Sequence, residues 1–179
     1  MSEAPRRRLP VLGAGTPPTP DEERPPWHWS GIGAVLTFSF WLPLAWAGAL
    51  LSQRWLARLI PGEGPEAIAT FLGQASGRER ALIRASLVAP GLLSCFASAA
   101  LAGFIVGRFG GKAGPKEAAV GGLVAGTFAS ALAAAGEGGG LVALLWLWPP
   151  IAGLGLLGGY LGGRLGRRRR EGEGAALTK

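Results

Sequence analysis

Only 16% of the 179 residues are charged and 49% are hydrophobic, whereas about a quarter are charged in typical soluble domains. The charges gather in patches and leave four uncharged stretches, residues 25–53, 85–107, 118–136 and 138–163. A soluble domain of this size has no core deep enough for four such segments. The composition therefore argues against a soluble helical bundle and favours a membrane protein.

Residues 1–26 are rich in proline and carry both basic and acidic patches. Such a stretch cannot bury enough apolar surface to fold, so we expect a disordered cytoplasmic segment here. Trp27, His28 and Trp29 follow it, where amphipathic rings favour the headgroup layer of a bilayer. His28 is the only histidine and has no cysteine or carboxylate at ligand spacing, so no metal site is expected.

Each uncharged stretch reaches or approaches the roughly 20 apolar residues that cross a bilayer core of about 30 Å. The pattern predicts an all-α, polytopic membrane protein with four transmembrane helices, at about 31–51, 86–107, 118–135 and 141–163. These helices would form a transmembrane domain over residues 27–166. A basic, flexible cytoplasmic tail is expected to follow over residues 167–179.

Residues 52–85 form the longest connection and contain two short amphipathic patterns. One apolar face includes Leu56 and Ile60, and a second includes Ile68 and Leu72. Their spacing predicts two short interfacial amphipathic helices along the membrane surface. The SGRE sequence that follows them has the form of a capping box and predicts the start of the next helix.

A short repeat links two of the predicted helix ends. Residues 101–112 read LAGFIVGRFGGK and residues 157–168 read LGGYLGGRLGRR, with five of the twelve positions identical. Both copies end a span that runs in the same direction. A true duplication would relate two helical hairpins by a pseudo-twofold axis, as in transporters with parallel repeats. The alternative is that glycine-rich helix ends followed by arginine resemble one another by composition alone.

Small residues recur at every fourth position on the last three predicted spans. A four-residue step advances only about 40° beyond a full turn, so each row forms a groove on one helix face. Burial cannot drive helices together in lipid, but small-xxx-small rows permit close backbone approach. Whether the partner is the same chain or another stays open. The predicted helix-packing residues are Gly103, Gly107, Gly122, Gly126, Gly155, Gly159 and Gly163.

Gly153, Gly155 and Gly158 also have the G-x-G-x-x-G spacing of a dinucleotide-binding turn. That turn follows a β-strand, whereas the preceding LWLWPP has two prolines and no β-branched residue. The glycines also continue beyond the motif at four-residue spacing, as a packing face requires. We therefore predict no cofactor site.

No predicted span carries an ionisable group in its central part, although proton-coupled carriers generally need one. The hydroxyls within the spans have no histidine, carboxylate or lysine partner, so we predict no catalytic residue and no metal site. Such hydroxyls more often bond the backbone of their own helix. They belong to Thr37, Ser39, Ser94, Ser98, Thr127 and Ser130.

Thirteen of the eighteen basic residues fall on the side of both termini, and the other five fall within residues 54–84. The positive-inside rule then predicts that both termini are cytoplasmic. The heavy use of Ala, Gly, Arg and Pro is typical of a GC-rich bacterial genome, so we expect a bacterial plasma (inner) membrane protein. The net charge is +7, but basic groups at membrane edges favour anionic lipid over nucleic acid, at about 1 kcal/mol each. We predict anionic-lipid contact by Arg164, Arg167, Arg168, Arg169 and Arg170.

Together these features predict a non-enzymatic integral membrane protein with a structural or accessory role. Its expected partners are the lipid bilayer, anionic headgroups, and either further copies of itself or other membrane subunits. Neither nucleic acid nor a cofactor is expected. The alternative is a small passive channel or transporter subunit built from two helical hairpins, which would need a polar stripe where the sequence has only scattered hydroxyls.

Overall fold

The computed structural model describes residues 27–60, 64–136 and 140–177, and within these ranges it is helical without any strand. The predicted disordered segment, residues 1–26, lies outside the described residues. Four of the helices are long and apolar enough to cross a membrane, which confirms the predicted four-helix, all-α membrane architecture. The helices are α1 (His28–Leu59), α2 (Pro65–Gln74), α3 (Gly77–Phe109), α4 (Pro115–Gly136) and α5 (Gly140–Leu177).

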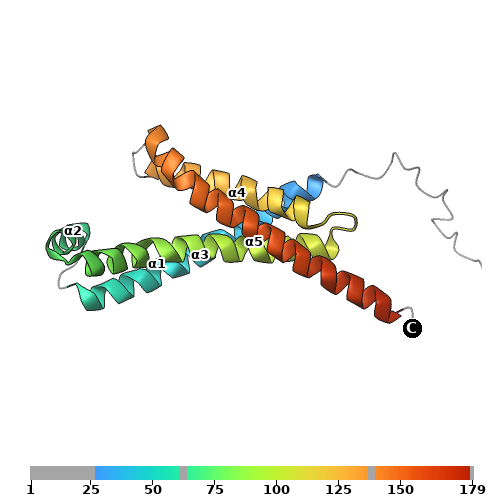
Figure 1. Ribbon diagram of the computed structural model, residues 1–179, viewed down its shortest axis with the longest axis horizontal. Coiled ribbons are helices and arrows are strands. Elements are labelled where there is room, and N and C mark those ends of the chain that lie inside the picture. The colour runs from blue at the N-terminus through green and yellow to red at the C-terminus, as the bar shows by residue number, and fades with distance from the viewer. Residues whose placement is uncertain (1–26, 61–63, 137–139, 178–179) are drawn as a thin grey trace, which may run out of the picture.

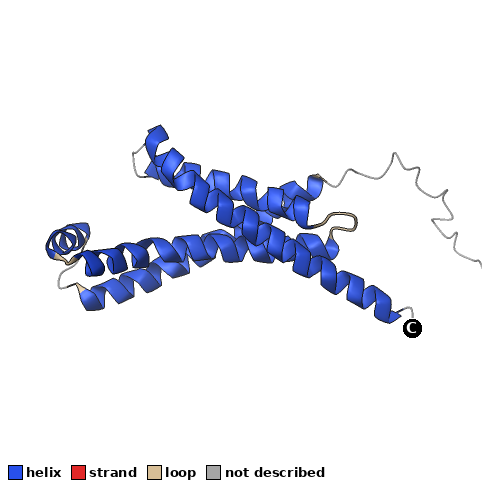
Figure 2. Ribbon diagram, in the orientation of Figure 1, coloured by secondary structure: helices blue, strands red, loops and turns tan. Residues whose placement is uncertain are grey.

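The four long helices form two antiparallel pairs, α1 with α3 and α4 with α5, which cross near their middles (Figures 1 and 2). α3 and α5 run in the same direction and pack against each other at the crossing. Toward the α3–α4 loop all four helices pack together. Toward α2 the two pairs diverge. We call these the closed half (residues 27–40, 94–126 and 152–177) and the open half (residues 41–60, 64–93, 127–136 and 140–151).

The closed half has a small core at its outermost end. Val106 of α3 and Ala118 of α4 are buried with Ala113 of the connecting loop, and Trp29 of α1 packs on them. The loop can turn tightly because Gly111 adopts a φ of +60°, a left-handed conformation that favours glycine. Small side chains therefore bring three helix ends together around one aromatic ring.

The connection over residues 52–85 differs from the prediction in its first part. Residues 52–59 are not a separate interfacial helix but continue α1 to Leu59, because neither proline nor glycine interrupts this stretch. The second amphipathic pattern does form a short helix, α2. Its partly buried apolar side chains, including Ile68, pack on a cluster of Leu56, Ile60 and Ile83. We call this unit of α2 and the adjoining ends of α1 and α3 the cap.

α3 begins at the predicted capping box, which is confirmed. The Ser76 backbone N–H donates to Glu79 Oε2 at 2.9 Å, and the Glu79 N–H donates to Ser76 Oγ at 3.4 Å. The helix therefore starts well before the uncharged span and reaches 33 residues. At about 1.5 Å per residue that is roughly 50 Å, so α3 extends beyond a bilayer core of about 30 Å.

α5 continues to Leu177, so residues 167–177 are helical where the sequence predicted a flexible tail. Two ion pairs lie along this extension. Arg167 Nε donates to Glu171 Oε1 at 2.7 Å, one turn along the same helix, and Arg108 Nη2 of α3 donates to Glu173 Oε1 at 3.0 Å. The glutamates that follow the arginine run therefore connect α5 to itself and to α3.

Candidate functional site

α5 carries two rows of glycine on different faces, and all six glycines are buried. The first row consists of Gly155, Gly159 and Gly163, and the second of Gly158, Gly162 and Gly166. A Cβ added to the first row would meet α4 or the turn before it, and a Cβ added to the second would meet α3. α5 is therefore held between two helices at positions that have no side chain.

Two glycine pairs bring the backbones of α3 and α5 into contact. A Cβ on Gly103 would fall on the carbonyl oxygen of Gly159, and a Cβ on Gly107 would fall on that of Gly163. In each pair the two glycines occupy equivalent positions of the repeat. The contact is not reciprocal, because a Cβ on Gly159 or Gly163 would meet α4 or the turn before it and not α3. It therefore does not distinguish a duplicated hairpin from resemblance by composition alone.

The glycines of α4 make the matching contacts. A Cβ on Gly122 would fall on the carbonyl oxygen of Gly155, and the reverse also holds. A Cβ on Gly126 would lie 2.8 Å from the Cα of Ala152. All seven predicted packing glycines thus lie at contacts between helices of this chain. Their faces are occupied within the chain and do not offer a free groove to a partner.

The seven predicted glycines are not the only ones that contact another helix. The sequence also places Gly158, Gly162 and Gly166 in a neighbouring row at the same spacing, and these three are buried against α3. Gly121 is buried with equally close neighbours on α1, and its only sequence signal was adjacency to Gly122. Gly91 continues the α3 row by spacing, yet a Cβ there would have no neighbour within 4 Å. Four-residue spacing alone therefore does not identify a packed position.

All six hydroxyls named from the sequence donate to a carbonyl three or four residues earlier in their own helix. The O···O distances are 2.8–2.9 Å, for Thr37, Ser39, Ser94, Ser98, Thr127 and Ser130. Thr127 also accepts the indole N–H of Trp148 at 3.1 Å, which joins α4 to α5. Within the described ranges no three potential metal ligands come together.

A seventh hydroxyl, that of Ser52, was not singled out in the sequence and bonds the backbone of a different helix. Pro90 has no N–H, so the carbonyl of Ser86 one turn earlier loses its helical donor. Ser52 of α1 donates to that carbonyl at 3.0 Å. The neighbouring helix thus satisfies a backbone group that the proline leaves free, as membrane helices with proline require.

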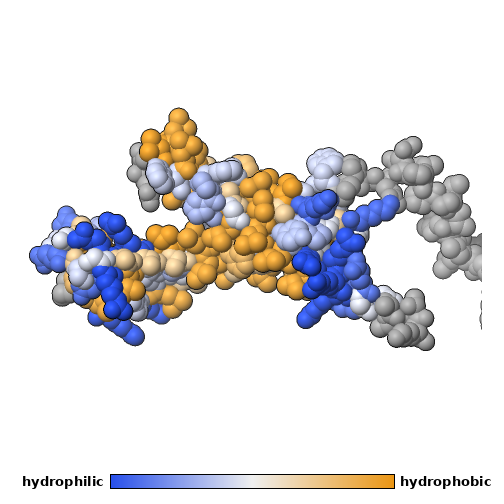
Figure 3. Space-filling view, in the orientation of Figure 1, coloured by the Kyte–Doolittle hydropathy of each residue, from blue (hydrophilic) through white to orange (hydrophobic). Residues whose placement is uncertain are grey.

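The five predicted lipid-contacting arginines divide into two groups. Arg167 pairs with Glu171, and the guanidinium of Arg169 lies 5.9 Å from the ring centroid of Phe104. Arg170 is partly buried. Arg164 and Arg168 are exposed and form no ion pair within the described part of the chain. They lie one turn apart on α5. Figure 3 shows a strongly hydrophilic region beside the apolar surface, toward the end of the molecule where α5 finishes.

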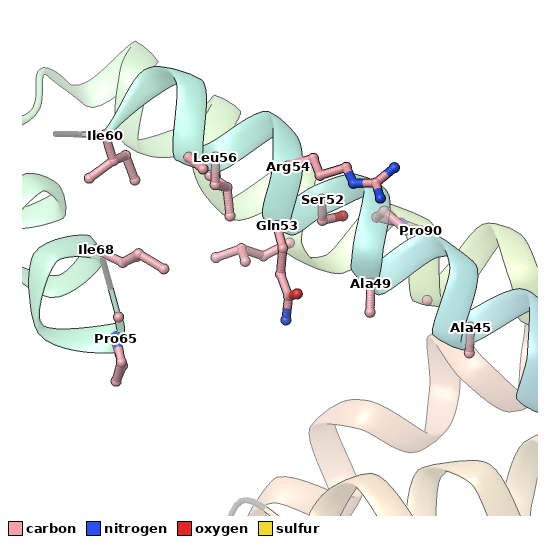
Figure 4. A pocket seen from close by; sticks show the side chains of 14 residues that line it. Ala45, Ala49, Ser52, Gln53, Arg54, Leu56, Ile60, Pro65, Ile68 and Pro90 are labelled. Atoms are coloured by element: carbon pink, nitrogen blue, oxygen red, sulfur yellow. The ribbon is translucent and has the colours of Figure 1, made fainter. Parts of the chain in front are cut away.

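The open half contains a cavity of about 810 Å³ between α1, α2 and α3. Ala45, Ala49 and Gln53 line it along one face of α1, and Pro90 and Gly91 line it from α3 (Figure 4). Its walls are mostly apolar, and its volume lies within the range of about 300–1,000 Å³ found for ligand pockets. No pattern in the sequence predicted this cavity, because it depends on how α2 packs against the ends of α1 and α3.

A comparison of the chain with protein-family models found no match, and searches of curated proteins and of solved structures also found none.

Proposed function

We propose that this chain is a non-enzymatic protein of a bacterial plasma membrane with a structural or accessory role in a larger membrane complex. The observation that carries the proposal is the use of the hydroxyls within the spans. All six bond the backbone of their own helix, and Ser52 completes the hydrogen bonding of a neighbouring one. Groups engaged in this way stabilise helices and are not presented as nucleophiles or bases.

The glycine contacts support a subunit that is packed before it meets any partner. Partner helices would then contact another surface, and α1 is the least buried of the four long helices. Only 6% of its most apolar window is buried, against 44% for α4. Val35, Leu42 and Trp46 are exposed on one face of α1, at spacings of seven and four residues. We assign the contact with other membrane subunits to this α1 face.

Site-specific photocrosslinking in intact membranes tests the assignment. A photoreactive residue at Leu42 is expected to capture another membrane protein. The matched control is Phe128, which is equally exposed on α4 and is expected to capture none. A chain that purifies alone as a monomer in mild detergent would contradict the accessory role, as would crosslinks at Leu42 only to further copies of the chain.

The alternative of a small passive channel needs polar groups that line a path between the helices. The six hydroxyls named from the sequence are engaged with backbone carbonyls instead, so we favour the accessory role. Proteoliposomes that contain the purified chain are expected to pass small ions and neutral solutes no faster than empty vesicles. Faster flux that depends on the amount of protein would favour the channel.

We also propose that both termini face the cytoplasm, with Arg164 and Arg168 at the headgroups of the inner leaflet. The support is the large basic excess on that side of the molecule, joined to the exposed position of these two arginines. A reporter that works only in the cytoplasm is expected to be active when it is fused after Lys179. Activity of a periplasmic reporter there would overturn the orientation.

A further inference from the structure

The cavity of the open half changes character along its length. Its inner end is formed by Ala45 and Ala49 of α1 and by Gly91 of α3, which lie within the uncharged spans. Gln53 and Arg54 line its middle, where the uncharged stretch of α1 stops, and apolar residues of the cap such as Ile60 and Ile68 line it beyond them. The inner end therefore lies at the depth of hydrocarbon, and the polar residues lie closer to the depth of headgroups.

The polar groups midway along the cavity have no hydrogen-bond or ion-pair partner among the described residues. Within the described part of the chain, Arg54 forms no ion pair and Gln53 forms no hydrogen bond, and both are exposed. Figure 4 shows the Gln53 side chain extending from α1 into the cavity. Ser52 also lines the cavity, but its hydroxyl is committed to the Ser86 carbonyl. A guanidinium with free donors is well suited to bind phosphate oxygens.

The walls also limit what can fill the cavity. α2 closes it on the side of the cap through Pro65 and Ile68. The small side chains of Ala45 and Ala49 leave room for an extended apolar chain along α1. An amphiphile with one acyl chain in this groove and an anionic head at Arg54 matches both the polarity and the orientation of the walls.

We propose that this cavity is a binding site for a bilayer phospholipid. One acyl chain lies along Ala45, Ala49 and Gly91, and the phosphate is held by Arg54. The site adjoins the α1 face assigned to protein partners, because Ala49 and Gln53 follow Leu42 and Trp46 along the same side of the helix. It is separate from the arginines at the opposite end of the molecule. The lipid comes from the leaflet on the side of α2.

Native mass spectrometry of the purified full chain in detergent micelles tests the site. Two probes carry the same acyl chains, dioleoyl phosphatidylglycerol with a phosphate and dioleoylglycerol without one. All proteins carry Arg164→Gln and Arg168→Gln, so the opposite end contributes little. We expect one bound phosphatidylglycerol and an affinity for dioleoylglycerol that is about tenfold or more weaker, as befits the loss of a charged hydrogen bond.

Two pairs of variants separate the parts of the site. Ala49→Trp and Gly91→Leu fill the groove. Both are expected to lower the affinity for both lipids at least about tenfold, because the acyl chain is excluded. Gly91 has open space around its Cβ position, so this variant keeps the fold. The matched controls are Ala47→Trp and Gly153→Leu, at exposed positions outside the cavity, and both should bind as the parent does.

A further pair of variants tests the assignment of the phosphate to Arg54. Arg54→Gln is expected to lower the affinity for phosphatidylglycerol to that for dioleoylglycerol. Arg58→Gln, one turn along α1 and outside the cavity, should not. Unchanged binding by both Ala49→Trp and Gly91→Leu would overturn the site. A preference for phosphatidylglycerol that survives in Arg54→Gln would overturn the headgroup assignment.

Discussion

The closed and open halves consist of similar apolar helices, but different contacts hold them together. In the closed half backbone meets backbone, as where Gly103 lies against the carbonyl of Gly159. In the open half the helix pairs part, and side chains make the contacts. There Ser52 bonds the Ser86 carbonyl, and Ile83 joins the apolar cluster beneath α2.

The difference shows that a glycine contributes to close packing only where the backbone of another helix lies against it. Gly122 faces Gly155, so their two helices approach to backbone contact. A Cβ on Gly48 of the open half would lie 3.0 Å from the Cβ of Pro90, and Gly91 faces no atom at all. Dispersion between matched surfaces therefore holds the closed half, whereas the open half keeps room for a ligand.

The largest effect is expected from Gly159→Leu in the closed half. Its Cβ would fall on the carbonyl oxygen of Ala118, and a backbone atom cannot move aside as a side chain can. We expect a loss of at least about 3 kcal/mol, the upper range for overpacked cores, measured as a lower midpoint of thermal unfolding in detergent. Gly153→Leu on the same helix, where a Cβ meets nothing within 4 Å, is the control. Equal stability of the two variants would refute the close packing of α5.

The addition of a single methyl group should change the free energy of unfolding in opposite directions in the two halves. Gly107→Ala places a methyl group on the carbonyl oxygen of Gly163 and should cost about 1–3 kcal/mol. Gly91→Ala adds the same group in open space. It should stabilise the chain by about 0.5–1 kcal/mol, because alanine favours the helix over glycine. Chemical denaturation in mixed micelles measures both. If both variants shift stability in the same direction, the contrast between the halves is wrong.

A smaller effect is expected where a side chain replaces a missing backbone hydrogen bond. Ser52→Ala leaves the Ser86 carbonyl without a donor and should cost about 1 kcal/mol. In a Pro90→Ala background the cost should vanish, because residue 90 then supplies the N–H. Ser39→Ala is the control, since its hydroxyl adds a second donor to the Val35 carbonyl of an intact helix turn. An undiminished cost in the Pro90→Ala background would count against this role.

Local signals in the sequence were sufficient for the helices and for some of their ends. Run length and hydropathy predicted four spans, and the SGRE sequence predicted the start of α3, because a helix terminus depends on neighbouring residues. The continuation of α1 to Leu59 was missed because its polar residues suggested a boundary. The helix continues past that boundary because its apolar side chains pack there against α2 and α3.

Contacts between residues far apart in the chain could not be predicted from the sequence. The glycine rows predicted close packing, but which face of α5 meets α3 depends on the crossing of the two hairpins. The pair of Arg108 and Glu173 joins residues 65 positions apart, so no spacing rule could indicate it. The cavity depends on how α2 packs against α1 and α3, and none of its walls is unusual in composition. Periodicity thus defines surfaces, and tertiary geometry decides what each surface meets.

The smallest expected effect lies at the start of α3, within the cap. Hydrogen bonds from Ser76, first from its side chain and then from its backbone, hold the pKa of the exposed Glu79 below its ordinary value of 4.5. A carboxyl with a lowered pKa stabilises the fold above its ordinary pKa, and that contribution is lost as the pH falls through the folded value.

The first turn of α3 should therefore begin to fray only in acid below pH 4.5, while the closed half, held by glycine contacts, stays unchanged. The Ser76 amide, followed by NMR, should titrate with a midpoint below 4.5, and Ser76→Ala should bring the Glu79 midpoint back toward that value. An identical Glu79 midpoint in both proteins would show that the capping box does not set this pKa. Fraying of the closed half over the same pH range would show that the two halves are not held independently.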